Sequence, residues 1–504
     1  MQECYLPTGN EWVSLPTLQA RTGALESFSF LHMGYKGLIE QRGGASLPLM
    51  TPFFETEGER ASLQSLTWGR KSDWIPTFCG TAGSLAVEGM LLAPVGERGF
   101  LYQLTVRSTS DKPLSSTFGL EGCWASAWHC VNEDKEIDGA RRCYTSLWND
   151  SLIFDMRCGL PLFAFAPMMD QPCSSTFQET DAGIVYRLAH ACTLEPGEAV
   201  TVTFYWGVGF EEVAAATSAK EMLRQGWQHE LQVTTDWLDA RRWPIPDAQL
   251  ERLYNTNLFF CLFYSAGITL DTEELVLVTS RSPRYYVSAA YWDRDSLLWS
   301  FPAIVLTDAA YAREILMHVF TRQIRNVGQH SRYIDGTLLE PGFELDELCA
   351  PVLALEGYLV RTGDPALLQE PCVKSGLFRI LSVLETKRHP EIELYETFLQ
   401  PTDDEIVYPY LTYDNALVWR VLLLLSEWLE RPDLARRAGG VKAAVYRYCV
   451  REGQFVWSTD LEGRYDIYDE PPGSLQLLPH YGFCAMEKHR TRHPLRGLSP
   501  VLRA

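Results

Sequence analysis

The chain has 504 residues, of which 46% are apolar and 21% charged, and its formal net charge is -20 at pH 7. This length exceeds what one hydrophobic core usually supports, so two folded parts are expected. The acidic balance argues against nucleic acid or an anionic membrane as a partner, because the summed field repels both. A neutral or small substrate fits better, and the oligomeric state stays open.

The N-terminal stretch and the cysteines predict the compartment. The first residues, "MQECYLPTGNEWVSLP", show no basic region followed by an apolar one, and no window approaches a membrane-spanning apolar run. Thirteen cysteines are scattered without a CxxC pair, so neither a disulfide framework nor a thiolate zinc site is indicated. A cytoplasmic protein with reduced cysteines is predicted.

Residues 1–213 have the pattern of an antiparallel β-sandwich. Short extended runs such as "SLAVEGMLLAPV", "GFLYQLTVRST", "SLIFDMRC", "GIVYRLAHACTL" and "AVTVTFYWGVGF" alternate with turn signals such as "GERG", "SDKP" and "EPGE". Residues 214–246 then change to helical composition and end in a Pro-x-Pro break. This segment is predicted to be a helical linker between two domains.

Residues 247–504 carry a period of 3.6, which is typical of helices. Asp247 is expected to cap the first helix and Thr307 the helix "DAAYAREILMHVF". About seven helices are expected, with an eighth beginning at Pro472. Long apolar helices joined by loops rich in Asp, Glu, Arg, Trp and Tyr favour an (α/α)6 toroid of helical hairpins over a simple bundle.

Four junctions between loop and helix combine carboxylates with aromatic rings. They are "YWDRDSLLWSFP" (291–302), "HSRYIDGTLLEPGFELDELCAP" (330–351), "QPTDDEIVYPYLTYDN" (400–415) and "YDIYDEPPGSLQLLPHYGF" (465–483). None has the spacing of a metal site, and no cofactor is indicated. Aromatic faces can cover the C–H surface of a sugar while carboxylates and Arg bind its hydroxyls, and one carboxyl can act as a general acid. The pattern therefore suits an oligosaccharide substrate.

Each junction also has a structural explanation. Asp293 can be an N-cap, and Asp295 a first-turn anion worth about 0.3–1 kcal/mol. Asp346 and Glu347 can open a helix in the same way. The run 403–405 can be a solvated acidic turn, and the aromatic residues are individually more typical of a core: Trp292, Trp299, Tyr333, Tyr408 and Tyr410. Four such junctions in one half of the chain are hard to obtain from capping alone.

At these residues the sequence resembles the six-hairpin glycosidases, and most closely the metal-independent exo-α-mannosidases of glycoside hydrolase family 125. Residues 292–296 are similar to a Trp-x-Arg-Asp-Ser stretch of the family, which implies that Arg294 and Asp295 bind the non-reducing sugar, beside Trp292. Residues 343–351, "FELDELCAP", resemble the family's Trp-Glu-Ile-Asp-Ser-Leu-Cys-Tyr-Pro. This likeness implies that Glu344 and Asp346 lie in the same pocket.

The third and fourth junctions also resemble family segments. The stretch "QPTDDEIVYPYL" is similar to an Arg-Pro-Ser-Asp-Asp segment that contains the catalytic acid, which implies that Asp403 or Asp404 is the general acid. The stretch "YDEPPGSLQLLPHYGF" resembles a segment that lines the cavity, with Asp469 and Glu470 at its head. The aromatic residues Tyr333 and Tyr410 complete the set of candidate sugar contacts.

Two features depart from the family. Residues 1–213 have no counterpart in its simplest members, although a sandwich joined by a helical linker is similar to bacterial glucoamylase-type enzymes. The predicted helices are too few to close a six-hairpin toroid, and the family's general base has no candidate. The final stretch, "EKHRTRHPLRGLSPVLRA", holds five Lys or Arg from Lys488 onward without an acid. An incomplete toroid, truncated at its C-terminus, is therefore expected.

The resulting functional hypothesis is an exo-acting, inverting α-glycosidase that needs no metal, with α-mannosides before α-glucosides as substrates. Asp403 or Asp404 would donate a proton to the glycosidic oxygen while another carboxylate activates water. The alternative from another class is a non-catalytic carbohydrate-binding protein, or an inactive fragment that lacks its base. A glucoamylase-type α-glucosidase or a glycoside phosphorylase is a lesser alternative.

Overall fold

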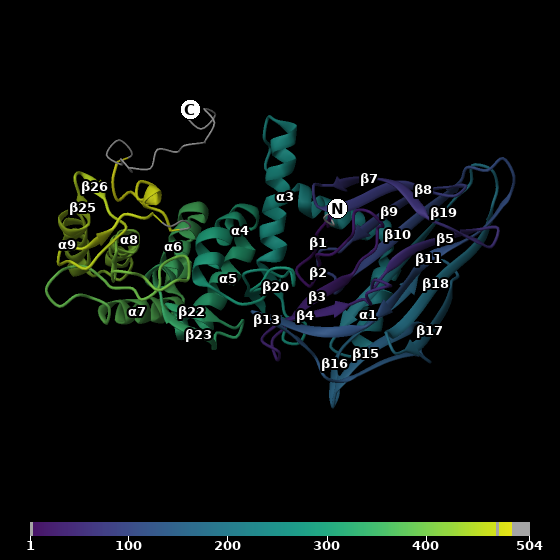
Figure 1. Cartoon of the computed structure of the whole chain (residues 1–504), viewed down its shortest axis with the longest axis horizontal. Helices are drawn as coiled ribbons and strands as arrows, with labels where there is room; N and C mark the ends of the chain where they lie inside the picture. Colours follow the sequence, from purple (N-terminus) through teal and green to yellow (C-terminus); the bar gives the residue numbers. More distant parts are fainter. Residues whose placement is uncertain (1–3, 470–472, 486–504) are drawn as a thin grey trace. The chain divides into compact units, whose positions relative to one another are not determined.

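A computed structural model describes residues 4–469 and 473–485 of the chain. It divides into two compact units, Met1–Ala290 and Tyr291–Ala504. The first unit consists mainly of antiparallel strands and the second mainly of helices (Figure 1). The predicted order, sheets first and helices second, is confirmed.

The first unit contains three large antiparallel sheets. One has the order β1-β2-β3-β4-β12-β13 (Thr8–Gly9, Val13–Leu15, Ser27–His32, Gly37–Arg42, Ser126–Val131, Glu133–Glu136). The largest has the order β14-β15-β16-β19-β10-β9-β8-β7 (Ala140–Thr145, Leu152–Cys158, Leu160–Met169, Ala199–Gly209, Gly99–Ser108, Leu85–Leu92, Ile75–Ala82, Leu63–Lys71). The third has the order β17-β18-β11-β5-β6 (Ser174–Thr180, Gly183–Leu194, Leu114–Trp124, Thr51–Thr56, Glu59–Ala61).

One hydrophobic core joins the three sheets. Phe28 from β3, Phe118 from β11 and Trp206 from β19 all lie in it with no exposed surface. The rings of Phe154 and Phe165, on neighbouring strands, stack with centroids 4.7 Å apart. The extended runs quoted from the sequence correspond to β9, β10, β15, β18 and β19, so these predicted strands are confirmed.

Three helices follow the sheets within the first unit: α1 (Glu212–Gln225), α2 (Trp227–Asp239) and α3 (Ala248–Tyr264). Helix α1 packs against β16 and β19 through buried Ala215 and Ala219. The helix can approach this closely because residue 207 is a glycine. A Cβ at this position would come within 2.1 Å of the Ala215 carbonyl oxygen. The segment predicted as a linker therefore packs on the sheet, and the division at residues 213 and 247 stays a prediction.

Glu230 on α2 provides a test of this first unit. Its side chain is buried, and Oε1 has no hydrogen-bond partner among the described residues. Burial, together with Glu97 and Glu221, raises the pKa of Glu230 to about 7. In the unfolded chain the pKa of a glutamate is about 4.3. The free energy of unfolding therefore falls as the pH rises from about 4 to 7, and the full loss applies above pH 7.

We therefore expect Glu230→Gln to raise the free energy of unfolding by about 2–3 kcal/mol at pH 8 and by less than about 1 kcal/mol at pH 5. Urea unfolding at the two pH values measures both. The control is Glu195→Gln in an exposed turn, with an expected change within about 0.5 kcal/mol. An equal gain at both pH values would contradict the assigned titration.

The second unit begins with a π-helix, η1 (Arg294–Ser300), that continues into α4 (Phe301–Thr307). The later helices are α5 (Ala309–Thr321), α6 (Leu345–Thr362), α7 (Pro371–Glu385), α8 (Thr412–Trp428) and α9 (Pro432–Tyr448). Short 3-10 turns are η2 (Gln323–Asn326), η3 (Pro365–Gln369) and η4 (Leu475–Leu477). In the first unit, the short strands β20 (Ala266–Ile268) and β21 (Leu275–Leu277) pair with each other. In the second unit, β22 (Gln329–Arg332) pairs with β23 (Leu338–Phe343), and β25 (Val450–Arg451) pairs with β26 (Gln454–Phe455). The second unit also has a small sheet of order β24-β27-β28 (Tyr410–Leu411, Ser458–Thr459, Tyr465–Asp466).

The helices of this unit form two adjacent rows. Helix α6 contacts α4 and α8 in one row and α5 and α7 in the other, α5 also contacts α4 and α7, and α9 packs on α8. Over the described residues these rows do not form a barrel, so the predicted toroid is not shown. Within the same ranges, no helix is long and apolar enough to cross a membrane.

Several helix ends differ from the sequence prediction. Asp247 caps α3 as expected, by accepting from the N–H groups of residues 249 and 250. The predicted cap at Thr307 is wrong, because Asp308 accepts from the first N–H groups of α5 and Thr307 ends α4 instead. The eighth helix is also not seen: residues 473–485 contain the turn η4, and Pro472 itself lies outside the described residues.

Candidate functional site

The motif at residues 291–296 is organised by a carboxylate from another helix. Glu347, in the first turn of α6, accepts hydrogen bonds from the backbone N–H groups of Asp293 and Arg294, the second at 3.0 Å. These N–H groups open η1 and would otherwise lack partners. The predicted capping role of Asp293 is therefore wrong. Its carboxylate instead accepts from the Tyr291 hydroxyl at 2.6 Å and pairs with Arg332.

The guanidinium of Arg294 binds carboxylates from two segments, the start of α6 and the loop that contains Asp403. Nε donates to Asp346 at 2.7 Å, and Nη1 donates to Asp403 at 2.8 Å. Nη2 binds Glu344 and lies 3.8 Å from Glu347. Only 2% of the Arg294 side chain is exposed. Burial would lower the pKa of Arg294, but the four carboxylates outweigh it and raise the pKa, so the guanidinium stays charged.

A second buried arginine, Arg332, belongs to the same network. Arg332 on β22 pairs with Asp293, lies 3.6 Å from Glu347 and has no exposed side-chain surface. Burial raises the pKa of Asp293, although Arg332 acts in the opposite direction. Charges of opposite sign thus alternate through the interior of this unit. Such a network is costly to break, because removing one member leaves a buried charge without its partner.

Two carboxylates of the cluster keep contact with solvent. The Asp295 side chain is half-buried. Burial raises the pKa of Asp295 to about 7, with Arg294 opposing and Asp403 adding to the rise. The Asp403 side chain is 38% exposed, and burial raises its pKa while Arg294 and His330 lower it.

Asp403 and Asp404 point in different directions. Asp403 has a φ of 69°, a left-handed conformation that Asp and Asn tolerate better than most residues, and it directs its carboxylate to Arg294. Asp404 is exposed and accepts from the Thr402 hydroxyl at 3.1 Å. The structure therefore brings only the first of these two adjacent acids into the cluster.

The predicted aromatic contacts are spread around the cluster. Trp292 is buried, and its ring meets the imidazole of His330 edge-on at 5.4 Å. Tyr333 is half-buried after β22. Tyr410 is buried on β24, and its ring lies 5.9 Å from that of His389.

At the fourth junction, Asp469 is bonded within its own segment. Asp469 accepts from the Ser474 hydroxyl at 3.0 Å and from the Leu475 N–H at 2.9 Å, so it stabilises its own turn. Glu470 lies outside the described residues. The predicted roles of both residues in sugar binding stay predictions.

Several further ionisable residues of the cluster were not predicted as site residues from the sequence: Asp293, His330, Arg332, Glu347 and Asp414. His330 and Arg332 are two residues apart on β22, so predicting a strand here would have placed both side chains on one face. Asp414 lies in the first turn of α8, is fully buried, and has no partner for either carboxylate oxygen among the described residues. Burial raises its pKa, which favours the neutral acid.

Three side chains of the cluster, from His330, Glu344 and Asp403, approach one another closely enough to hold a cation. Ligand atoms of His330, Glu344 and Asp403 lie within 4.8 Å of one another. Both carboxylates, however, already bind the guanidinium of Arg294. The arrangement is therefore that of an ion-pair cluster in which Arg294 takes the place of a metal ion, and no metal is assigned.

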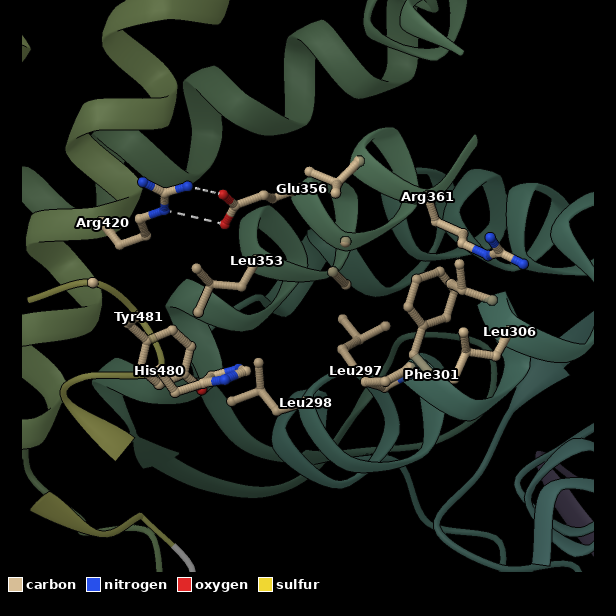
Figure 2. A pocket seen from close by; sticks show the side chains of 16 residues that line it. Leu297, Leu298, Phe301, Leu306, Leu353, Glu356, Arg361, Arg420, His480 and Tyr481 are labelled. Atoms are coloured by element: carbon tan, nitrogen blue, oxygen red, sulfur yellow. Dashed lines mark hydrogen bonds and ion pairs between the residues drawn. The ribbon is translucent and has the colours of Figure 1, made fainter. Parts of the chain in front are cut away.

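A separate apolar groove of about 590 Å³ lies in the same unit (Figure 2). Leu297 and Phe301 line one wall and Leu353 another, and the ion pair between Glu356 and Arg420 lies at one side (Figure 2). None of the predicted site residues lines this groove. Helix α6 contributes Asp346 to the cluster from its first turn and Leu353 to the groove two turns later, so the two features occupy different parts of the same helix.

No protein-family model matches the sequence, and no curated protein matches it. The structure is similar to a bacterial glucoamylase complexed with acarbose, with a TM-score of 0.55 and 10% identity over 91% of this chain and 71% of that one. It is also similar to a putative kojibiose phosphorylase from the human microbiome, with a TM-score of 0.54 and 11% identity over 89% and 68%.

A third solved structure is a metal-independent α-mannosidase of Streptococcus pneumoniae with α-1,6-mannobiose. Its TM-score of 0.40, at 18% identity over 53% of this chain and 73% of that one, is too low to support an argument. Identities of 10% and 11% show the fold alone. The chain therefore shares, over most of its length, the fold of proteins described as a glucoamylase and a kojibiose phosphorylase.

Proposed function

We propose that the chain is a glycoside-active enzyme: an exo-acting, inverting α-glycosidase, with α-mannosides before α-glucosides as substrates. The observation that carries this proposal is the buried guanidinium of Arg294, which draws Glu344, Asp346 and Asp403 together. A charged, rigidly held guanidinium beside two carboxylates that are partly exposed to solvent suits a ligand that offers hydroxyl groups. The likeness to two carbohydrate-related folds supports the same class.

Asp295 is assigned to the terminal sugar. With a pKa of about 7, its carboxyl is present in both protonation states near neutral pH. It can therefore donate a hydrogen bond to one sugar hydroxyl or accept one from it. Its neighbour Arg294 keeps its pairing with the carboxylates and acts as the fixed support.

Asp403 is assigned as the general acid, in preference to Asp404. Burial raises the pKa of Asp403, which is the direction of shift that a general acid requires. Asp404 is exposed and bonded to its own turn. An inverting reaction also needs a carboxylate about 6.5–9.5 Å from the acid, on the other face of the sugar, to activate water.

The test is the configuration of the released sugar. We would incubate the protein with α-mannobiose and α-glucobiose and follow the anomeric protons by NMR. Sugar that first appears as the β anomer supports the proposal, and first appearance of the α anomer overturns the inverting mechanism. Release that requires inorganic phosphate would indicate a phosphorylase instead. Binding of the same sugars without any turnover would indicate the carbohydrate-binding alternative.

A further inference from the structure

His330 occupies a special position in the cluster, between carboxylates from three segments. On β22, its Nδ1 lies 2.5 Å from Oε1 of Glu344 and 3.9 Å from Oδ1 of Asp403. Its Nε2 lies 3.6 Å from Oε2 of Glu340 on β23. Only 12% of the His330 side chain is exposed. The edge-on contact with Trp292 fixes the plane of the ring.

These neighbours favour the charged imidazole. Burial by itself would lower the pKa of His330, but the hydrogen bond to Glu344 and the charges of Glu344, Asp403 and Glu340 outweigh it and raise the pKa. Asp403 consequently faces two cations, Arg294 at 2.8 Å and His330 at 3.9 Å. Of these two, only His330 can lose its charge near neutral pH, since an arginine stays protonated.

We propose that His330 is a positioning residue of this site: held by Glu344, it sets through its own charge how strongly Asp403 retains a proton. While His330 is charged, the ionised form of Asp403 is favoured. When His330 loses its proton, this stabilisation disappears and Asp403 becomes a weaker acid. The electrostatic coupling stands on the geometry alone, and its catalytic consequence rests on the proposed function.

The coupling is tested without any substrate. Protein labelled with 13C at Cε1 of histidine is titrated by NMR, and His330→Gln identifies the resonance of His330. We expect the His330 pKa to lie above the ordinary value, and Asp403→Asn to lower it by about half a unit to one unit, because an attractive charge is removed. Asn tolerates the left-handed backbone at this position, so the substitution preserves the local fold.

A matched control is Asp433→Asn on α9, where the side chain is 38% exposed and pairs with Arg431. This substitution is expected to leave the His330 pKa unchanged. A His330 pKa that does not move in Asp403→Asn, or that moves equally in both variants, would overturn the proposal. A role in packing against Trp292 alone predicts no response to Asp403.

A second measurement concerns catalysis. In His330→Gln, Asp403 loses a neighbouring positive charge, so the pH above which kcat falls is expected to rise by up to about one unit. His229→Gln, on the exposed face of α2, is the control with an unchanged profile. An unshifted limb in His330→Gln would overturn the influence on the acid. If no glycoside is turned over while the NMR coupling is present, the proposed function fails and the electrostatic inference stands.

Discussion

Replacing Arg294 by methionine is expected to lower the free energy of unfolding of the helical unit by about 3–5 kcal/mol. Arg294 is almost fully buried and pairs with Glu344, Asp346 and Asp403. Methionine fills much of the same space but cannot neutralise a carboxylate, so several buried anions must either take up protons or remain unpaired. The large expected cost comes from these abandoned acids, since the net value of an intact buried pair is small.

Urea unfolding followed by far-UV circular dichroism measures this effect on the helices. The matched control is Arg420→Met, because Arg420 pairs with one carboxylate, that of Glu356, and 34% of its side chain is exposed. Its expected cost is at most about 1 kcal/mol. A second variant, Arg294→Lys, keeps the charge and loses the planar donors, so an intermediate loss is expected. Equal stability of Arg294→Met and the unmodified protein would contradict the role assigned to the cluster.

Much of the site could be predicted from the sequence, because three of the four acidic junctions meet at the side chain of Arg294. Glu344, Asp346 and Asp403 come from the second and third junctions, and all three bind Arg294 of the first. Each junction lies at the start of a helix or just before one, which is why residues far apart in sequence converge. The choice between Asp403 and Asp404 required the backbone, because it depends on the left-handed conformation at residue 403.

Other parts of the site depend on packing that a local pattern does not contain. His330 reaches Glu344 through the pairing of β22 with β23, whose register shifts twice over a few residues. Glu347 was expected to act within its own helix, yet its carboxylate binds the start of η1. Likewise, amphipathic helices can be predicted from the period of their apolar residues. That period does not determine which neighbouring helices pack on them, so the sequence alone could not establish a toroid.

The largest functional effect is expected for Asp403→Asn. If Asp403 protonates the leaving oxygen, its loss should lower kcat by about 10²–10⁴ on a disaccharide, whose leaving group needs that proton. On a 2,4-dinitrophenyl glycoside the expected loss is far smaller, because that leaving group departs as a stable anion. Asp404→Asn is the matched control, expected to stay within a few-fold on both substrates. Equal losses on the two substrates, or an equally large loss in Asp404→Asn, would assign Asp403 to binding, because only a proton donor makes the defect depend on the leaving group.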